Sequence, residues 1–298
     1  MIFLNQLLQG VFLGGYYALI ACSLSFLFGV MRIVNLAHGS IVVLSAFLLF
    51  VLADRFELSP WLALVLVVPA MAGLGWLLQR LVLDRSLRGG ALVPLLATFG
   101  LAIVLDNALF ETFGADTRSL APAIGELSYD SWTLTDDISI GKLDVLILAS
   151  AVALLGALDL LLTRTRIGRA IRATAEDPAT VGLIGIDARA VYAMATALAL
   201  AMAAVAGAFL AMRATFDPYT GGAQLIFAFE AVVIGGFGSL WGTLGGGIVL
   251  GVAQNIGAAI DPSGFFIAGH VTFLVVLVGR VAAGGDVLRR LVRRRGAA

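Results

Sequence analysis

Residues 8–28 read LQGVFLGGYYALIACSLSFLF, a run without a charged side chain. A helix that crosses the hydrocarbon core of a bilayer needs about 20 predominantly apolar residues. The run is long for the apolar part of a cleavable signal peptide, and no basic residue precedes it. The sequence therefore predicts that Leu8–Phe28 is a first membrane helix.

The remainder of the chain has the same apolar character. Hydrophobic residues make up 60% of the 298 residues and charged residues 13%, whereas soluble domains are roughly 45–50% apolar and about 25% charged. We therefore expect a bilayer to cover much of the apolar surface. Five further runs are long enough to span it: Trp61–Leu83, Ala91–Phe113, Leu143–Thr163, Val191–Arg213 and Phe265–Val281.

Two other apolar regions, Asn35–Leu52 and Leu225–Asn255, contain glycines that break the pattern. The second region is expected to form two short half-helices that meet at Gly235-Gly236-Phe237-Gly238-Ser239. Irregular backbone at membrane depth is tolerated only where protein or a water-filled cavity satisfies it, and such breaks often mark a transport path. The sequence thus predicts an all-α polytopic protein with about eight membrane segments, some broken or re-entrant, in a single transmembrane domain over residues 1–298.

Charged side chains predict which ends of the segments face the cytoplasm. Arginines are concentrated in the connection 164–189 and in the tail after Val281, and positively charged connections stay in the cytoplasm. The mainly acidic stretch 114–142 is expected outside. The pattern indicates a multi-pass protein of a bacterial inner membrane, whose cytoplasmic C-terminal tail contacts lipid phosphate. The formal net charge is zero, and no nucleic acid partner is expected.

The connection 164–189 also contains signals for a short helix. Asp177 is a favourable N-cap, Pro178 suits the first helical position, and Gly185 can end a helix in a left-handed conformation. The predicted helix, Pro178–Ile184, offers an apolar surface of Val181, Leu183 and Ile184. Because so short a helix is unstable alone, it is either a docking element for a partner or part of an ordinary turn.

Several short motifs together resemble the permeases of bacterial branched-chain amino acid ABC transporters, of the LIV-I type. RATAEDPA at 172–179 with GLIGI at 182–186 is similar to their cytoplasmic coupling segment, and IVNLAHGS at 33–40 to their Asn-Ala-His-Gly element. ATFGL at 97–101 and IGGFGSLWG at 234–242 are similar to their central and late segments. The N-terminal element is most like the LivH-type subunit. Ser40 and Glu230 depart from the family pattern.

The resemblance implies a non-catalytic membrane subunit that forms half of a translocation pathway. It implies four kinds of partner: a second, LivM-like permease, two ATPase subunits, an extracytoplasmic substrate-binding protein and membrane lipid. ATP and magnesium would be bound by the ATPases, because Gly141-Lys142 is followed by Leu143 and forms no phosphate-binding loop. No cofactor or metal is expected in this chain, whose single cysteine, Cys22, lies in an apolar run.

The expected substrate is a branched-chain or other hydrophobic amino acid. Two alternatives stay open at this point: a permease for urea or short amides, and a self-contained secondary transporter or channel, which broken segments alone would also allow. An intramembrane enzyme is disfavoured, because no His/Glu metal motif or Ser-His-Asp set is found.

Polar and glycine residues at membrane depth are the candidates for the pathway. Glu230 either faces the pathway or a subunit interface, or pairs with an arginine such as Arg213, whereas His38 is favoured as a structural hydrogen bonder. The pathway candidates are Asn35, His38, Ser40, Thr98, Asp106, Asn107, Glu230, Gly235, Gly236 and Gly238. The coupling candidates are Arg172, Ala175, Glu176, Asp177, Pro178, Val181, Gly182, Leu183, Ile184 and Gly185.

Overall fold

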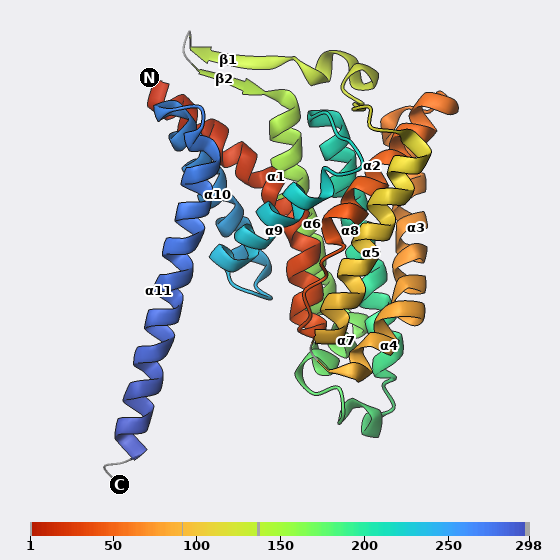
Figure 1. Ribbon diagram of the computed structural model, residues 1–298, viewed down its shortest axis with the longest axis vertical. Helices are drawn as coiled ribbons and strands as arrows, with labels where there is room; N and C mark the ends of the chain where they lie inside the picture. Colours follow the sequence, from red (N-terminus) through yellow and green to blue (C-terminus); the bar gives the residue numbers. More distant parts are fainter. Residues whose placement is uncertain (1, 91, 136–137, 296–298) are drawn as a thin grey trace.

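The computed structural model describes residues 2–90, 92–135 and 138–295. It is a bundle of helices with one antiparallel hairpin (Figure 1). The long helices are α1 (Ile2–Met31), α2 (His38–Arg55), α3 (Pro60–Leu78), α5 (Leu92–Phe113), α6 (Lys142–Arg164), α8 (Ala188–Arg213), α9 (Gly221–Gly235), α10 (Leu240–Ile260) and α11 (Gly264–Arg295). Shorter elements are the π-helical turn Gln79–Leu83, α4 (Asp84–Ser86), α7 (Arg166–Glu176), the 3₁₀ turns Leu87–Gly89, Pro122–Ser128 and η4 (Val181–Ile184), and strands β1 (Ser131–Thr135) and β2 (Ile138–Gly141).

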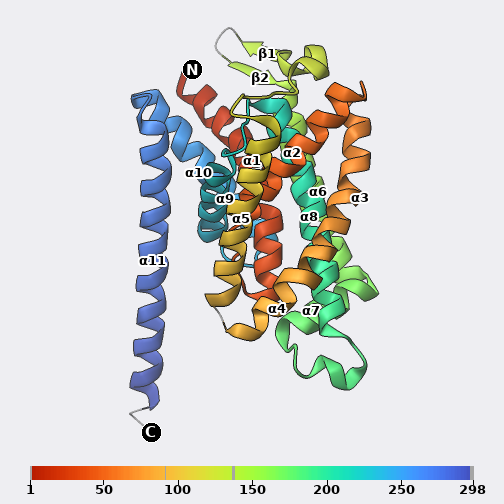
Figure 2. The same cartoon turned by 45° about the vertical axis from the view of Figure 1, so that its right-hand side comes forward.

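Eight helices are long and apolar enough to cross a membrane, which confirms the predicted all-α polytopic class. The hairpin β1–β2 lies at one end of the bundle, and α4 and α7 lie at the other (Figures 1 and 2). We call these the hairpin end and the α7 end. The N-terminus lies at the hairpin end, and α11 runs the length of the molecule to finish at the α7 end (Figure 1).

Helix α1 forms the centre of the bundle. Its residues Ala18–Cys22 are fully buried, as expected for a helix that is apolar on all sides, and it packs against α6, α8, α9 and α10. Helix α11 stands at the rim (Figure 2). Its outer face, which includes Ile267, Val271 and Val275, is exposed, so lipid or another subunit must cover it.

The first broken region differs from the expectation. Helix α2 continues through Gly39 without interruption, and the irregular backbone is the preceding segment 32–37. Arg32 has a left-handed backbone with φ of 54°. The ring Nε2 of His38 lies 2.9 Å from the carbonyl oxygen of Ile20, in the middle of α1. Helix α2 therefore begins inside the bundle, beside the middle of α1, and rises to the hairpin end.

The second broken region contains the predicted glycine turn between α9 and α10. Gly236 and Gly238 have φ of 103° and 75°, which favour glycine because it lacks a Cβ atom. The expectation of two half-helices is wrong for the second segment, since α10 has 21 residues and is long enough to cross a membrane. Only α9, with 15 residues, is short. The glycines of α10 do not interrupt it, and most of them, including Gly246, Gly247 and Gly251, contact neighbouring helices.

These contacts bring helix backbones together. A Cβ atom added to Gly14 of α1 would lie 2.4 Å from the Cα of Ile248, and one added to Gly247 of α10 would lie 2.6 Å from the carbonyl oxygen of Gly14. No side chain fits between the two helices at this point. Small residues allow this close approach, which supplies packing energy in lipid, where helices gain little from the hydrophobic effect.

Replacing Gly247 with alanine is expected to destabilise the bundle. The added methyl group must push α1 away from α10, and overpacking of this kind costs about 1–3 kcal/mol. Gly245→Ala is a matched control on the same helix, because its methyl group would meet no atom within 4 Å. Thermal unfolding of the purified protein in detergent should show a lower midpoint for Gly247→Ala alone. Equal midpoints for the two variants would contradict the described α1–α10 contact.

Candidate transport pathway and coupling surface

Five of the predicted pathway residues, including His38, gather where α2 begins. Asn35 is 1% exposed; its Oδ1 accepts a hydrogen bond from the Ala37 amide, while its Nδ2 is buried without a partner among the described residues. The Thr98 hydroxyl of α5 accepts a hydrogen bond of 3.1 Å from the Leu36 amide. Ser40 lies next to Asp106 of α5, whose Oδ1 is also buried and unpartnered. The start of α2 is thus lined with polar groups, two of which have unused bonding capacity.

Helix α9 begins at the same place as α2. A Cβ atom on Gly39 would lie 1.9 Å from the carbonyl oxygen of Gly221, so the first turns of α2 and α9 are in backbone contact. His38 is buried and anchors this start to α1 through Ile20 and, at 3.4 Å, the hydroxyl of Ser23. Amide groups at a helix N-terminus carry partial positive charge and favour anions. Two such ends therefore meet inside the bundle.

The remaining pathway candidates lie apart from this cluster. Asn107 points away from it on an exposed part of α5, where its Nδ2 bonds the carbonyl of Ile103. Gly235 contacts Gly242 across the turn between α9 and α10. The Arg280 guanidinium of α11 donates to the carbonyl of Ile234 at 2.8 Å and caps the end of α9. The predicted glycines thus form a packed turn, and the structure does not place them with Asn35 and Ser40.

Glu230 of α9 has a different partner from the suggested Arg213. Its side chain is 4% exposed, and Oε1 lies 2.5 Å from Nδ1 of His270 on α11. Its other oxygen, Oε2, is buried without a described partner. The pair ties the rim helix α11 to α9. Sequence reasoning missed it because the two residues are 40 positions apart and His270 lies in an otherwise apolar run.

Sequence reasoning also missed a polar cavity at the hairpin end. It encloses about 380 Å³ between α1, α8, α9, α10 and α11. Its apolar wall includes Leu13, Phe227 and Phe265. Its polar lining is Gln9, Tyr16, Tyr17, Arg213, Thr215, Gln224 and Asn255. The available signal was the set of amides in apolar runs, of which Gln224 and Asn255 are the clearest.

The charged group of this cavity is Arg213, at the end of α8. Its Nε lies 3.2 Å from Oδ1 of Asp144 on α6, and its guanidinium carbon lies 5.2 Å from the centre of the Tyr16 ring. The Tyr16 hydroxyl donates to Gln224 at 2.9 Å. Nearby, the Tyr17 hydroxyl donates to Oε1 of the buried Gln254, whose Nε2 has no described partner. The cavity therefore offers a held cation, several amides and an apolar wall.

At the α7 end, the prediction of a helix over Pro178–Ile184 is wrong. Helix α7, which precedes it, was not expected, and only η4 (Val181–Ile184) is helical within the predicted range. In α7, Gly168, Ile171 and Thr174 face the bundle while arginines occupy other faces. That repeated spacing of three residues was the available signal. A Cβ atom on Gly168 would lie 2.1 Å from the carbonyl oxygen of Leu161, so α7 rests directly on α6.

The segment after α7 is held by Asp177 in a turn. Its carboxylate accepts hydrogen bonds from the Thr180 hydroxyl and from the amides of Thr180 and Ala179, which lower the pKa of Asp177 below its ordinary value. Asp177 follows α7 and does not cap a longer helix at 178. Gly185 ends η4 in the expected left-handed conformation, with φ of 80°.

The apolar side chains of η4 divide between the bundle and the surface. Val181 is 4% exposed and packs inward, contrary to the expected contact surface, whereas Leu183 and Ile184 are 85% and 71% exposed. Of the other coupling candidates, Arg172, Ala175 and Glu176 lie in α7, Pro178 lies in the turn that follows it, and Gly182 lies in η4. The α7 end therefore presents two uncovered apolar side chains on a fixed turn.

Removing His270 is expected to destabilise the protein through Glu230. In His270→Leu the buried carboxylate loses its only described partner, which costs about 1–3 kcal/mol. The double variant Glu230→Gln/His270→Leu removes the charge as well and should recover part of that loss. Thermal unfolding in detergent measures both. A double variant less stable than His270→Leu would show that the pair does not hold α11 against α9.

Comparison with known proteins gives one consistent result. The family described as the permease component of the branched-chain amino acid transport system matches residues 6–278. The chain is 30% identical over 269 residues to the high-affinity branched-chain amino acid permease protein BraD of Pseudomonas aeruginosa, with 87% of each chain covered. It is 30% identical to LivH of Escherichia coli, with 86% of each covered, and 28% identical to a probable LivH of Methanocaldococcus jannaschii. The chain belongs to the family of branched-chain amino acid transport permeases.

Proposed function

We propose that this chain is the LivH-like permease subunit of an ATP-binding-cassette importer for branched-chain or other hydrophobic amino acids. It forms half of the translocation pathway in a bacterial inner membrane and performs no catalysis itself. A LivM-like permease forms the other half, two ATPase subunits bind ATP and magnesium, and an extracytoplasmic binding protein delivers the substrate. Family membership supports the transport role, and the α7 end supports the role of separate ATPases.

The observation that carries the proposal is the exposure of Leu183 and Ile184. Two large apolar side chains in water are unfavourable unless a partner covers them. They lie on a turn fixed by Asp177, beside the arginine-rich helix α7. Excess arginine indicates the cytoplasmic side. A cytoplasmic ATPase with an apolar groove is the partner that fits this position.

The contact between α7 and α6 provides a route for coupling. Because Gly168 brings α7 onto the backbone of α6, a force applied at η4 moves α7 and α6 together. Val181, buried beneath η4, adds a second attachment. Closure of the ATPases around ATP thereby changes the packing of α6 against α1, at the centre of the bundle.

The cavity at the hairpin end suits a hydrophobic amino acid that arrives from outside. The guanidinium of Arg213 can meet the carboxylate, and the amide oxygen of Asn255 can accept from the ammonium group. The Phe227 and Phe265 walls suit an aliphatic side chain. The cluster at Asn35 and Asp106 lies deeper, beside the converging starts of α2 and α9, and provides the next polar contacts. Urea or a short amide would leave the apolar wall unused.

Uptake by the reconstituted transporter tests this proposal. Proteoliposomes that contain both permeases and both ATPases, with ATP on the ATPase side and binding protein on the opposite side, should accumulate labelled leucine. Omitting the ATPases or ATP should abolish uptake, and excess urea should not compete. ATP-independent uptake by this chain alone would contradict the proposal and favour a self-contained transporter.

Leu183→Asp is expected to uncouple ATP hydrolysis from uptake. A carboxylate placed in an apolar groove loses its hydration, so docking weakens, while membrane insertion is unaffected because residue 183 lies outside the membrane segments. Leucine uptake should fall by about tenfold or more, which corresponds to a loss of at least about 1.4 kcal/mol in docking. Leu183→Met keeps an apolar side chain of similar volume and should transport normally. Normal uptake by Leu183→Asp would remove the docking role.

A further inference from the structure

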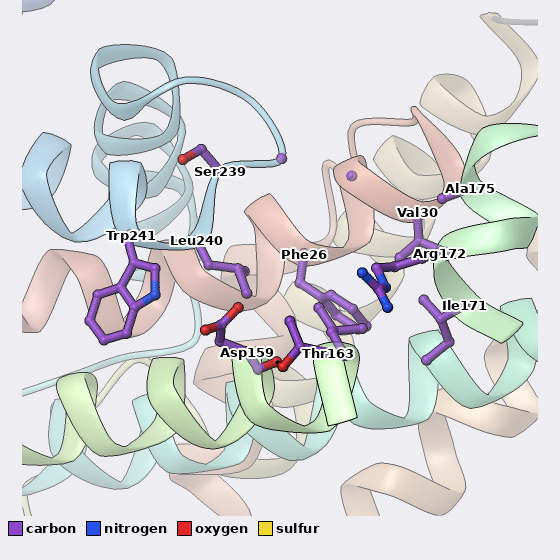
Figure 3. Close-up of a pocket in the computed structure, with 13 residues that line it drawn as sticks. Phe26, Val30, Asp159, Thr163, Ile171, Arg172, Ala175, Ser239, Leu240 and Trp241 are labelled. Atoms are coloured by element: carbon purple, nitrogen blue, oxygen red, sulfur yellow. Dashed lines mark hydrogen bonds between the residues drawn. The ribbon is translucent and has the colours of Figure 1, made fainter. Parts of the chain in front are cut away.

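A second cavity lies at the α7 end, where the coupling candidates Arg172 and Ala175 line it, apart from the exposed side chains of η4. It encloses about 300 Å³ between the last turns of α1 and α6, helix α7, and the glycine turn that precedes α10. Its volume is at the lower limit of typical small-molecule sites, about 300–1,000 Å³. Figure 3 shows the side chains that line it.

One acidic and one basic side chain enter this cavity from different helices. Arg172 reaches in from α7 and Asp159 from α6 (Figure 3). The salt bridges found among the described residues do not include either of them, and neither side chain has a described hydrogen-bond partner. Arg172 is exposed and Asp159 is half-buried, so the cavity offers two charges at separate positions, both open to a ligand.

The rest of the lining is mostly apolar. Phe26 and Val30 of α1, Leu240 and Trp241 of α10, and Ile171 of α7 supply aromatic and aliphatic surface. A ligand that matches all of these groups needs a carboxylate for Arg172, an ammonium group for Asp159 and an apolar side chain. A small anion would leave Asp159 unpaired, and a metal ion would be repelled by Arg172. A free hydrophobic amino acid carries the full set of groups.

We propose that this cavity is a second binding site for a free hydrophobic amino acid, on the face opposite the hairpin end. The substrate class rests on the proposed transport function. A bound molecule joins α7, through Arg172, to α6, through Asp159, and to the glycine turn, through Leu240 and Trp241. It therefore holds the coupling helix against the turn. The transported product thereby occupies a site where it opposes movement of α7 and slows its own import.

Protection of a cysteine in the cavity tests binding directly. In Thr163→Cys the new thiol lines the cavity, while the native Cys22 is buried. The complete transporter is placed in lipid nanodiscs without ATP, and labelling of this chain by a maleimide dye is followed with increasing leucine. Saturating leucine should slow labelling several-fold. Ile167→Cys, on α7 outside the cavity and 45% exposed, is the matched control and should label at an unchanged rate.

Loss of either charge should weaken protection. Asp159→Asn in the Thr163→Cys background should raise the half-protecting leucine concentration by about tenfold or more, because a hydrogen bond to a charged group is lost. Leucinamide lacks the carboxylate and 4-methyl-2-oxopentanoate lacks the ammonium group, so both should protect correspondingly less. Labelling that is unaffected by leucine, or protection equal for the three compounds, would overturn the proposal.

Two further arms separate this site from its alternatives. A phosphatidylethanolamine headgroup is also zwitterionic, so the assay is repeated in nanodiscs of phosphatidylglycerol alone. Protection by leucine in both lipids supports an amino acid site, whereas labelling that responds to phosphatidylethanolamine and not to leucine assigns the cavity to lipid and overturns the proposal. Because the assay uses no ATP and no uptake, its failure is distinguishable from failure of the transport function.

A transport assay tests the effect on import. In ATP-driven uptake, leucine on the ATPase side should lower the uptake rate of the wild type and leave the uptake rate of Asp159→Asn unchanged.

Discussion

Direct contact between helix backbones is the constraint on which this structure depends. At Gly14 and Gly247 a methyl group would lie within 2.6 Å of backbone atoms of the facing helix, and the same is true where Gly39 meets Gly221. Lipid gives helices little hydrophobic reason to associate, so close packing at small residues must hold them together. The first contact fixes α10 against the central helix α1. The second fixes the starts of α2 and α9 against each other inside the bundle.

That arrangement creates backbone groups that a bilayer cannot satisfy, and nearby side chains compensate. The amides before α2 bond Asn35 and Thr98, and Arg280 bonds a carbonyl at the end of α9. Irregular backbone at this depth is stable only beside protein or water. The unused polar atoms of Asn35 and Asp106 sit at the same place. A break in the helices thus places unpaired polar atoms in an otherwise apolar interior, which is where we propose that the substrate passes.

The sequence predicted the membrane segments well because run length and charge depletion are local properties. Most predicted runs match a described helix within a few residues, as for Leu143–Thr163 and α6 (Lys142–Arg164). The break at Gly236 was also local, because the chain there needs a positive φ. Features that depend on distant neighbours were not predictable. Glu230 and His270, and Arg213 and Asp144, meet only after folding. The packing of Gly247 and Gly251 of α10 against α1 also depends on distant neighbours. Helix α7 was not predicted because the cap signals at Asp177 and Pro178 favoured a later helix.

The central claim is that the α7 end is cytoplasmic and is driven by separate ATP-hydrolysing subunits. A photo-reactive amino acid in place of Ile184, which is 71% exposed, tests it most directly in cells that express the complete transporter. The account predicts that light produces a covalent adduct between this chain and an ATPase subunit, identified by mass spectrometry. An adduct with the extracytoplasmic binding protein, or none with any ATPase, would contradict the account.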